Sequence, residues 1–202
     1  MIITGPEIKE QIEQRHIDID PFDESCINPA SIDLTLGSTV SVYNAWVSTG
    51  YEFEHAPSHF DGSYIQRTLN VIDIKKQADL QTFKIHEDLG WVLKPDILYL
   101  MHTRERVHTK RYVPVLDGKS SIGRLGIVIH LTAGYGDPGF DGQYTLEVTV
   151  VHAIRIYAGM RFCQMRFHTC AGDLLDYQDT GHYKGLAAQG PVASQAYKQF
   201  SV

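Results

Sequence analysis

The sequence predicts a mostly β protein, either a barrel or two packed sheets of short strands. Short apolar segments recur along the chain with turn-forming residues between them, whereas patterns of helical period are few. The chain has 202 residues, of which 43% are hydrophobic, and this is enough to bury one sizeable core. We therefore expect one main domain.

The first expected elements are a short helix and a pair of strands. Pro6 precedes Ile8 and Ile12, which stand about one helical turn apart, a pattern typical of a helix that begins near the proline. Over residues 31–42 apolar side chains alternate in part with polar ones, and Gly37 interrupts them. This pattern indicates two strands separated at Gly37.

Further strands are expected in the second half of the chain. Residues 91–95 and 97–101 are apolar segments around a Pro-Asp turn. Residues 126–131 are β-branched and apolar, and residues 144–150 alternate cleanly. Residues 44–82 are polar and irregular, and an insertion with short strands is the interpretation left open for them.

Lys119, Ser120, Ser121 and Arg124 form a compact polar group that would suit a phosphate. If the two serines cap a short helix near 120–126, free backbone N–H groups and both hydroxyls point to one spot. Arg124 lies four residues after Ser120, on the same helical face, and Lys119 adds a second positive charge. A polyphosphate fits this arrangement, and an ordinary capped surface helix with basic side chains fits it equally.

A glycine-rich hairpin and a lone carboxylate follow this group. The glycines within 134–142 lack a Cβ atom, which permits sharp turns and lets the backbone approach a flat ligand closely. Asp137 stands at the apex, before a Pro-Gly pair typical of a type II turn. In the alternating strand after the hairpin, Thr145 and Glu147 share the face opposite to Leu146. Glu147 is then either a group that faces a ligand or a solvated strand carboxylate.

Composition restricts the partners of the protein. The net charge of −6 argues against general binding to duplex nucleic acid, so a polyanionic ligand would need a local basic cluster. No apolar run of about 18 residues and no basic-apolar signal segment occurs, and we expect a cytoplasmic protein without a membrane partner. The three cysteines lie far apart and do not suggest a disulfide framework.

Four segments resemble the signature of the dCTP deaminase family, within the trimeric dUTPase superfamily. They are INPASIDL at 27–34, GKSSIGRLG at 118–126, TAGYGDPGFDGQYTLE at 132–147 and YAGMRFCQ at 157–164. The resemblance implies a distorted jelly-roll of the dUTPase-like type, a homotrimer with sites shared between subunits, and deamination of dCTP to dUTP and ammonia. It also implies Mg²⁺ bound through the nucleotide phosphates, and dTTP as a candidate inhibitor.

By the same resemblance, the matching residues have distinct roles. Glu147 would accept a proton from water and pass it on, and Ser120 and Arg124 would position and polarise that water. Asp137 would bind the 3′-hydroxyl side of the deoxyribose. The other substrate-binding residues that the resemblance implies are Lys119 and Ser121 at the triphosphate, the backbone near Thr145 and Leu146 at the base edge, Ala133 in the hairpin, and Gln164 and Tyr177 at further nucleotide contacts.

The hairpin leaves two products open. Ala133-Gly134-Tyr135 resembles a subgroup of the family that also cleaves dUTP to dUMP and diphosphate, in which Asp137 would help to activate a second water. Against this, Gly136 stands where the family usually has an isoleucine. The sequence therefore allows either dUTP or dUMP as the final product.

The sequence favours a reaction without zinc. Zinc-dependent deaminases use a His-x-Glu pattern together with a Pro-Cys-x-x-Cys pattern. None of the ten histidines has Glu two residues later, and no Cys-x-x-Cys occurs. Cys163, His168 and Cys170 are near one another but lack a fourth ligand. A carboxylate must then carry the proton transfers, and we expect no residue that ligates a metal directly.

Residues 181–202 are expected to form a flexible C-terminal lid on a nucleotide-binding domain that spans 1–180. Small, turn-forming residues with little apolar anchoring are typical of mobile termini. The resemblance implies that this lid folds over the triphosphate and excludes water. The family's lysine and glutamine are out of place here, and Lys184, His182 and Gln189 are the candidates to replace them.

Two other functions stay open from the sequence. A dUTP pyrophosphatase shares the fold and the hairpin aspartate but has no need of Glu147. A catalytically silent nucleotide-sensing module on the same fold would bind dCTP or dTTP and release no product. Turnover of dCTP separates a deaminase from both alternatives.

Overall fold

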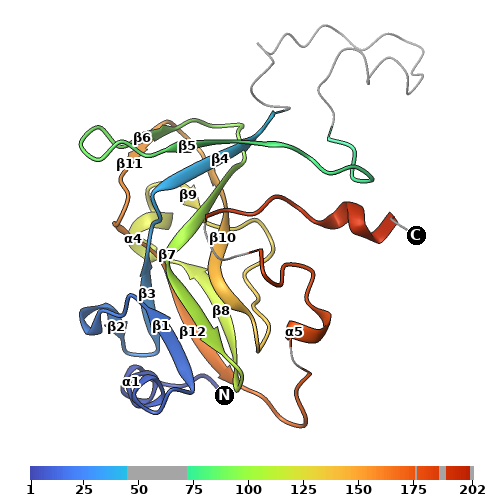
Figure 1. Ribbon diagram of the computed structural model, residues 1–202. Coiled ribbons are helices and arrows are strands. Elements are labelled where there is room, and N and C mark those ends of the chain that lie inside the picture. The colour runs from blue at the N-terminus through green and yellow to red at the C-terminus, as the bar shows by residue number, and fades with distance from the viewer. Residues whose placement is uncertain (45–71, 176, 187–189, 201–202) are drawn as a thin grey trace, which may run out of the picture.

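The structure is a computed structural model that describes residues 1–44, 72–175, 177–186 and 190–200. Within these residues the chain forms antiparallel sheets with a few short helices (Figure 1), so the predicted mostly β class is confirmed. Most of the irregular segment 44–82 lies outside the described residues, and the interpretation of an insertion there stays open. No helix in the described part of the chain is both long and apolar enough to cross a membrane.

The N-terminal elements agree with the sequence patterns. The helix expected near Pro6 is α1, which includes that proline in its first turn, and the strands on either side of Gly37 are β3 and β4. The elements up to the middle of the chain are α1 (Gly5–Glu13), β1 (Ile17–Asp20), η1 (Glu24–Cys26), β2 (Ile27–Asn28), β3 (Ser31–Thr35), β4 (Thr39–Tyr43), β5 (Leu80–Lys84), β6 (Trp91–Leu93) and β7 (Tyr99–Thr109).

The remaining elements carry most of the candidate site residues. The strand expected over 144–150 is the end of a longer strand, β10, and a short helix does begin at Ser120. The elements are β8 (Tyr112–Gly118), α4 (Ser120–Gly123), β9 (Ile127–Val128), β10 (Asp141–Val150), β11 (Ile154–Ile156), β12 (Arg161–Thr169), α5 (Tyr177–Thr180) and η2 (Ala196–Phe200).

Two larger sheets enclose the core. Among the described strands, β5, β4, β7, β10 and β9 lie side by side in that order with β1 also paired to β7, and β2, β3, β12 and β8 form a second sheet. Strands β11 and β6 make a separate pair. Met101 of β7, Leu146 of β10, Leu34 of β3 and Phe167 of β12 are fully buried in one apolar cluster. Both sheets therefore present their apolar faces to a common interior.

The strand expected over 126–131 is much shorter than predicted. Its ladder with β10 ends after two residues, Ile127 and Val128. Beyond them the backbone N–H of Leu131 donates to the side chain of Glu147, at 3.1 Å, rather than to a strand carbonyl. The expected strand therefore ends at Val128, and the Leu131 N–H is satisfied by a side chain.

A buried histidine explains the glycine between β3 and β4. A Cβ atom on Gly37 would lie 2.1 Å from the ring of His102, which is 6% exposed. The Nδ1 atom of this ring lies 2.9 Å from the Thr103 carbonyl oxygen. Burial lowers the pKa of His102, and the contact of its ring with the Thr103 carbonyl offsets this only in part.

We expect His102 to make the stability depend on pH. An unfolded histidine titrates near ~6.5, so below this pH the unfolded chain binds a proton that the folded chain refuses. The free energy of unfolding should therefore fall between about pH 7 and about pH 5, measured by urea denaturation. His102→Gln should fall less than the parent protein, whereas His152→Gln, at an exposed position, should fall as much as the parent. An equal fall in all three proteins would contradict this role of His102.

Candidate active site

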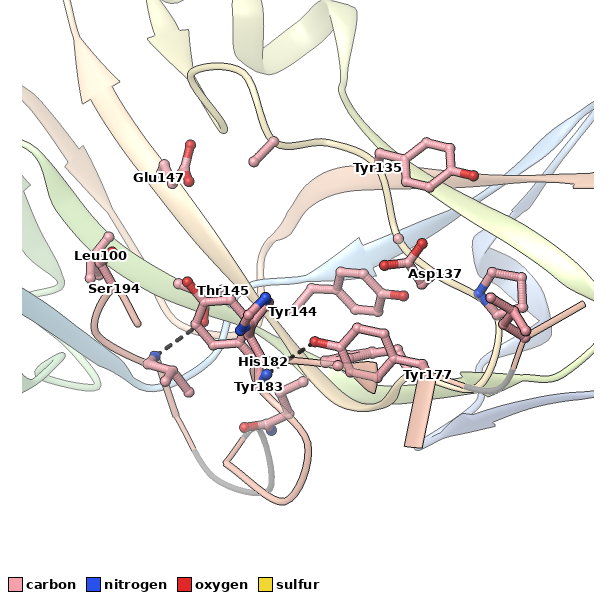
Figure 2. Close-up of a pocket in the computed structure, with 18 of the residues that line it drawn as sticks. Leu100, Tyr135, Asp137, Tyr144, Thr145, Glu147, Tyr177, His182, Tyr183 and Ser194 are labelled. Atoms are coloured by element: carbon pink, nitrogen blue, oxygen red, sulfur yellow. Dashed lines mark hydrogen bonds between the residues drawn. The ribbon is translucent and has the colours of Figure 1, made fainter. Parts of the chain in front are cut away.

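A cavity of about 600 Å³ opens between the hairpin before β10, the strand β10 itself and the C-terminal segment (Figure 2). Six of the residues predicted from the sequence line it, and both carboxylates of the site are among them. The six residues are Ala133, Asp137, Thr145, Glu147, Tyr177 and His182. A cavity of this size is within the range of small-molecule sites.

Glu147 faces the cavity because of the alternation along β10. Thr145 and Glu147 line the cavity, and Leu146 between them is fully buried in the core on the other face. The side chain of Leu146 therefore cannot contact a ligand in the cavity, which leaves only its backbone for the base-reading role expected near it. The Leu131 N–H holds one oxygen of the Glu147 carboxylate, so the two arms of the hairpin fix the direction of this group.

Asp137 lies on the loop between β9 and β10, as the turn signal predicts. It is exposed and lines the cavity from the side of the loop. The Phe140 N–H donates to the Asp137 carbonyl, at 3.2 Å, which closes the turn around Pro138. The carboxylate of Asp137 and that of Glu147 thus enter one cavity from different backbone segments (Figure 2).

An aromatic wall that we did not predict from the sequence completes this side of the cavity. The ring of Phe140 packs edge-on against Tyr144, with centroids 4.7 Å apart, and against Tyr177, with centroids 5.6 Å apart. Burial raises the pKa of Tyr144, and the nearby Asp137 and Tyr177 raise it further. Burial likewise raises the pKa of Tyr177. Both phenols are therefore neutral hydrogen-bond donors at physiological pH.

The sheet shows why the strand pattern did not reveal Tyr144. The alternation of β10 alone assigns it to the core face with Leu146. The register of β10 against β7 shifts between Gln143 and Thr145, and the Tyr144 N–H donates to the Thr103 side chain, at 3.0 Å. Such a shift redirects side chains locally. Tyr144 packs against the core and also lines the cavity.

The described parts of the C-terminal segment contact the cavity wall through backbone N–H groups. Gly190 donates to the Gln143 side chain at 2.9 Å, and Val192 donates to the Thr145 hydroxyl at 3.1 Å. Of the three residues expected to replace the family's lid side chains, His182 lines the cavity. Lys184 is exposed outside it, with Nζ 3.5 Å from the Asp179 carbonyl, and Gln189 lies outside the described residues.

The residues predicted to bind phosphate lie apart from this cavity. Lys119, Ser120, Ser121 and Arg124 are not among the described residues that line it, and the last three are exposed. Gln164 is also outside it, where its side chain accepts from the Ser31 hydroxyl at 3.0 Å and donates to the Gly118 carbonyl at 3.0 Å. Within one subunit, the structure therefore divides the predicted site into two groups.

The expected capping of α4 by serines is wrong. The helix begins at Ser120, its N-cap is the extended residue Lys119, and no side-chain cap bond forms in this described segment. The ammonium of Lys119 pairs with the carboxylate of Asp33 in β3, whose side chain is only 2% exposed. Asp33 also accepts from Asn28, at 2.7 Å. Lys119 is thus fixed beside the helix start, with its charge partly balanced.

Asp137 is the residue at the cavity that suits the expected Mg²⁺, which the sequence analysis places on the nucleotide phosphates. Among the described residues, no group of three or more His, Cys, Asp and Glu side chains is arranged to hold a metal ion. Mg²⁺ commonly keeps several waters and binds through one or two carboxylates together with substrate phosphates. Asp137 is exposed at the cavity and could supply such a carboxylate.

Comparisons with known proteins agree on one family. A family model described as dCTP deaminase-like matches residues 2–170. A protein named dCTP deaminase, dUMP-forming, from Leptospira biflexa is 40% identical over 200 residues, which cover 99% of this chain and 98% of the relative. A protein of the same name from Clostridium acetobutylicum is 39% identical over 200 residues, covering 99% of both chains.

A solved structure shows the same fold. The crystal structure of 2′-deoxycytidine 5′-triphosphate deaminase from Agrobacterium tumefaciens matches with a TM-score of 0.58 and 19% identity. The match covers 92% of this chain and 53% of the solved chain, so this chain spans about half the length of that protein. At this identity the likeness concerns the architecture of the sheets.

Proposed function

The chain belongs to the dCTP deaminase-like family, and on this premise we propose that it converts dCTP to dUMP, ammonia and diphosphate. The observation that carries this proposal is the meeting of Glu147 and Asp137 in one cavity, because the two hydrolytic steps need a carboxylate at two different places. The relatives named dUMP-forming and the Ala133-Gly134-Tyr135 segment support the second step.

In the first step, Glu147 acts as the general base and then as the general acid. Water adds to C4 of the cytosine ring, and the carboxylate of Glu147 takes a proton from this water. The proton then passes to the amino group, the C4–N bond breaks, and ammonia leaves with the oxygen retained on the ring as dUTP. The hydrogen bond from Leu131 supports this role, because it keeps the carboxylate directed into the cavity.

In the second step, Asp137 orients a water for attack on the α-phosphorus of dUTP. A new bond forms between the water oxygen and this phosphorus, the bond to the bridging oxygen breaks, and diphosphate leaves. The proton of the water passes to the Asp137 carboxylate. Mg²⁺ bound through the phosphates would neutralise part of their charge. The exposed position of Asp137 at the cavity supports this role.

We further propose a homotrimer in which the phosphate-binding residues of one subunit complete the cavity of another subunit. These residues are Lys119, Ser120, Ser121 and Arg124. The division of the predicted site within one chain supports this, since Ser120 and Arg124 are exposed and do not line the chain's own cavity. Apolar side chains beside α4 are exposed as an interface would require. They are Leu125, Val128, Leu131 and Val151, exposed by 43% to 70%.

The C-terminal segment is proposed to be the lid of the site. Its backbone donors already meet the cavity wall at Gln143 and Thr145, and His182 enters the cavity from the same segment. Closure over a bound nucleotide would exclude bulk water from both reactions. dTTP, which is also a pyrimidine deoxynucleoside triphosphate, would compete for the same cavity as an inhibitor.

Incubation with dCTP, dCMP or dUTP in the presence of Mg²⁺ tests the proposal. We expect ammonia and dUMP in equal amounts from dCTP, dUMP from dUTP, and slow or no turnover of dCMP, which lacks the two outer phosphates that the basic residues would bind. Chromatography separates the nucleotides, and a coupled assay measures ammonia. A chelator selective for zinc, with Mg²⁺ in excess, should leave the rates unchanged.

Three other results would identify a different function or mechanism. Turnover of dUTP without ammonia from dCTP would identify a dUTP pyrophosphatase. Binding of dCTP or dTTP with no product would identify a sensing module. Loss of ammonia release on zinc chelation would contradict the role given to Glu147.

A further inference from the structure

At the wall of the cavity, the Tyr144 hydroxyl lies where a side chain at position 136 would be. A Cβ atom on Gly136 would lie 2.6 Å from the Tyr144 hydroxyl oxygen, closer than such atoms approach in folded proteins. The next nearest atoms belong to Pro114, at 3.0 Å. Any larger residue at position 136 would therefore force the phenol out of its place. The absence of a side chain at Gly136 is what admits the Tyr144 hydroxyl.

This hydroxyl lies next to the carboxylate that precedes Pro138. Figure 2 shows the Tyr144 ring directed towards Asp137, and the charge of Asp137 contributes to the raised pKa of the phenol. Because its pKa is raised by burial and by Asp137, the phenol stays protonated and can only donate to a carboxylate or accept from water. Phe140 packs edge-on against the ring and restricts its rotation.

We propose that Tyr144 is a positioning residue for Asp137, and that Gly136 is glycine so that the Tyr144 hydroxyl can reach that carboxylate. This inference rests on the proposed function and deepens its second step. Tyr144 donates to one oxygen of Asp137 when the nucleotide is bound, which leaves the other oxygen to orient the water that attacks the α-phosphorus. Glu147 enters the cavity from its own position on β10, so the proton transfers of deamination do not depend on the Tyr144 hydroxyl.

Tyr144→Phe removes the hydroxyl and keeps the ring. The ratio of dUTP to dUMP that this variant forms from dCTP tests the positioning role of the hydroxyl. We expect kcat for conversion of dUTP to dUMP to fall about tenfold, the effect of one lost hydrogen bond to a charged group, with KM for dUTP changed less than about twofold. Release of ammonia from dCTP should stay within about twofold of the parent rate. The variant should therefore release dUTP from dCTP where the parent protein releases dUMP.

Gly136→Ala tests the same pair from the other side. Its Cβ atom displaces the hydroxyl without removing it, so it should also shift the product from dUMP to dUTP. In the Tyr144→Phe background, Gly136→Ala should add little further loss, because the atom it would displace is already absent. Thermal unfolding checks the folding of all variants. If one single variant folds poorly, the product ratio of the other single variant carries the test.

Tyr112→Phe is the matched control, because Tyr112 is buried outside the cavity. It should keep the parent's product ratio. An unchanged ratio and unchanged kcat in Tyr144→Phe would overturn the inference and make Tyr144 a packing residue. If the parent protein forms ammonia and only dUTP, the inference also falls while deamination stands. If the parent forms neither ammonia nor dUMP, the proposed function itself fails.

Discussion

Replacing Glu147 with glutamine is expected to reduce ammonia release from dCTP by about a thousandfold or more, because general acid–base catalysis is lost at the reacting carbon. Glutamine has nearly the same shape, and its amide oxygen can still accept the Leu131 N–H that now binds the carboxylate. The fold and the affinity for dCTP should therefore change little. Stopped reactions measure ammonia, and calorimetric titration with dCTP measures binding.

Two further observations make the result specific to Glu147. Glu87→Gln, at an exposed position outside the cavity, should keep full activity. Hydrolysis of dUTP by Glu147→Gln should continue, since Asp137 serves that step. A variant that still releases ammonia at the parent rate would remove Glu147 from the mechanism, whereas one that no longer binds dCTP would show that the carboxylate acts in binding.

Arg124→Ala is expected to lower kcat/KM for dCTP by about a hundredfold or more, because charge-assisted hydrogen bonds to the phosphates and the attacking water are lost. Arg124 is exposed and lies outside the cavity of its own subunit, so the loss should be felt in the cavity of a neighbour. Arg104→Ala, at an exposed position that does not line the cavity, is the matched control and should remain active, since the substitution leaves the backbone carbonyl at position 104 in place.

Mixed trimers of the two inactive variants test the shared site directly. Arg124→Ala and Glu147→Gln chains are unfolded together and refolded as an equal mixture. A shared site is intact when an Arg124→Ala chain supplies its Glu147 and a neighbouring Glu147→Gln chain supplies its Arg124. Random assembly of a shared site gives about one quarter of the parent activity. If both residues acted within one chain, the mixture would stay inactive. A protein that remains monomeric in solution would also contradict the shared site.

The sequence predicts most of the sheet structure because burial on one face imposes a period of two residues. The alternation over 144–150 correctly separates the buried Leu146 from Glu147, which lines the cavity. The same reasoning predicts the break at Gly37, although it does not identify His102 as the reason. Local patterns of this kind survive folding because each side chain meets the same core.

Features that depend on distant partners were predicted wrongly or missed. The ion pair that holds Lys119 at the start of α4 was missed, because its partner Asp33 lies 86 positions earlier in the sequence. The place of Tyr144 depends on the register shift against β7 and on the room left at Gly136. Neither contact leaves a periodic signal in the sequence, so only the folded chain reveals them.

The backbone hydrogen bonds of the C-terminal segment affect which substitutions this segment can tolerate. Gly190, Val192 and Ser194 hold the wall with main-chain amides, while the acceptors are the side chains of Gln143, Thr145 and Tyr43. Every residue except proline carries such an amide, so positions 192 and 194 can exchange side chains without loosening the segment, whereas Gly190, at φ +82°, favours glycine. Because all three acceptors are uncharged, its hold should also be insensitive to ionic strength.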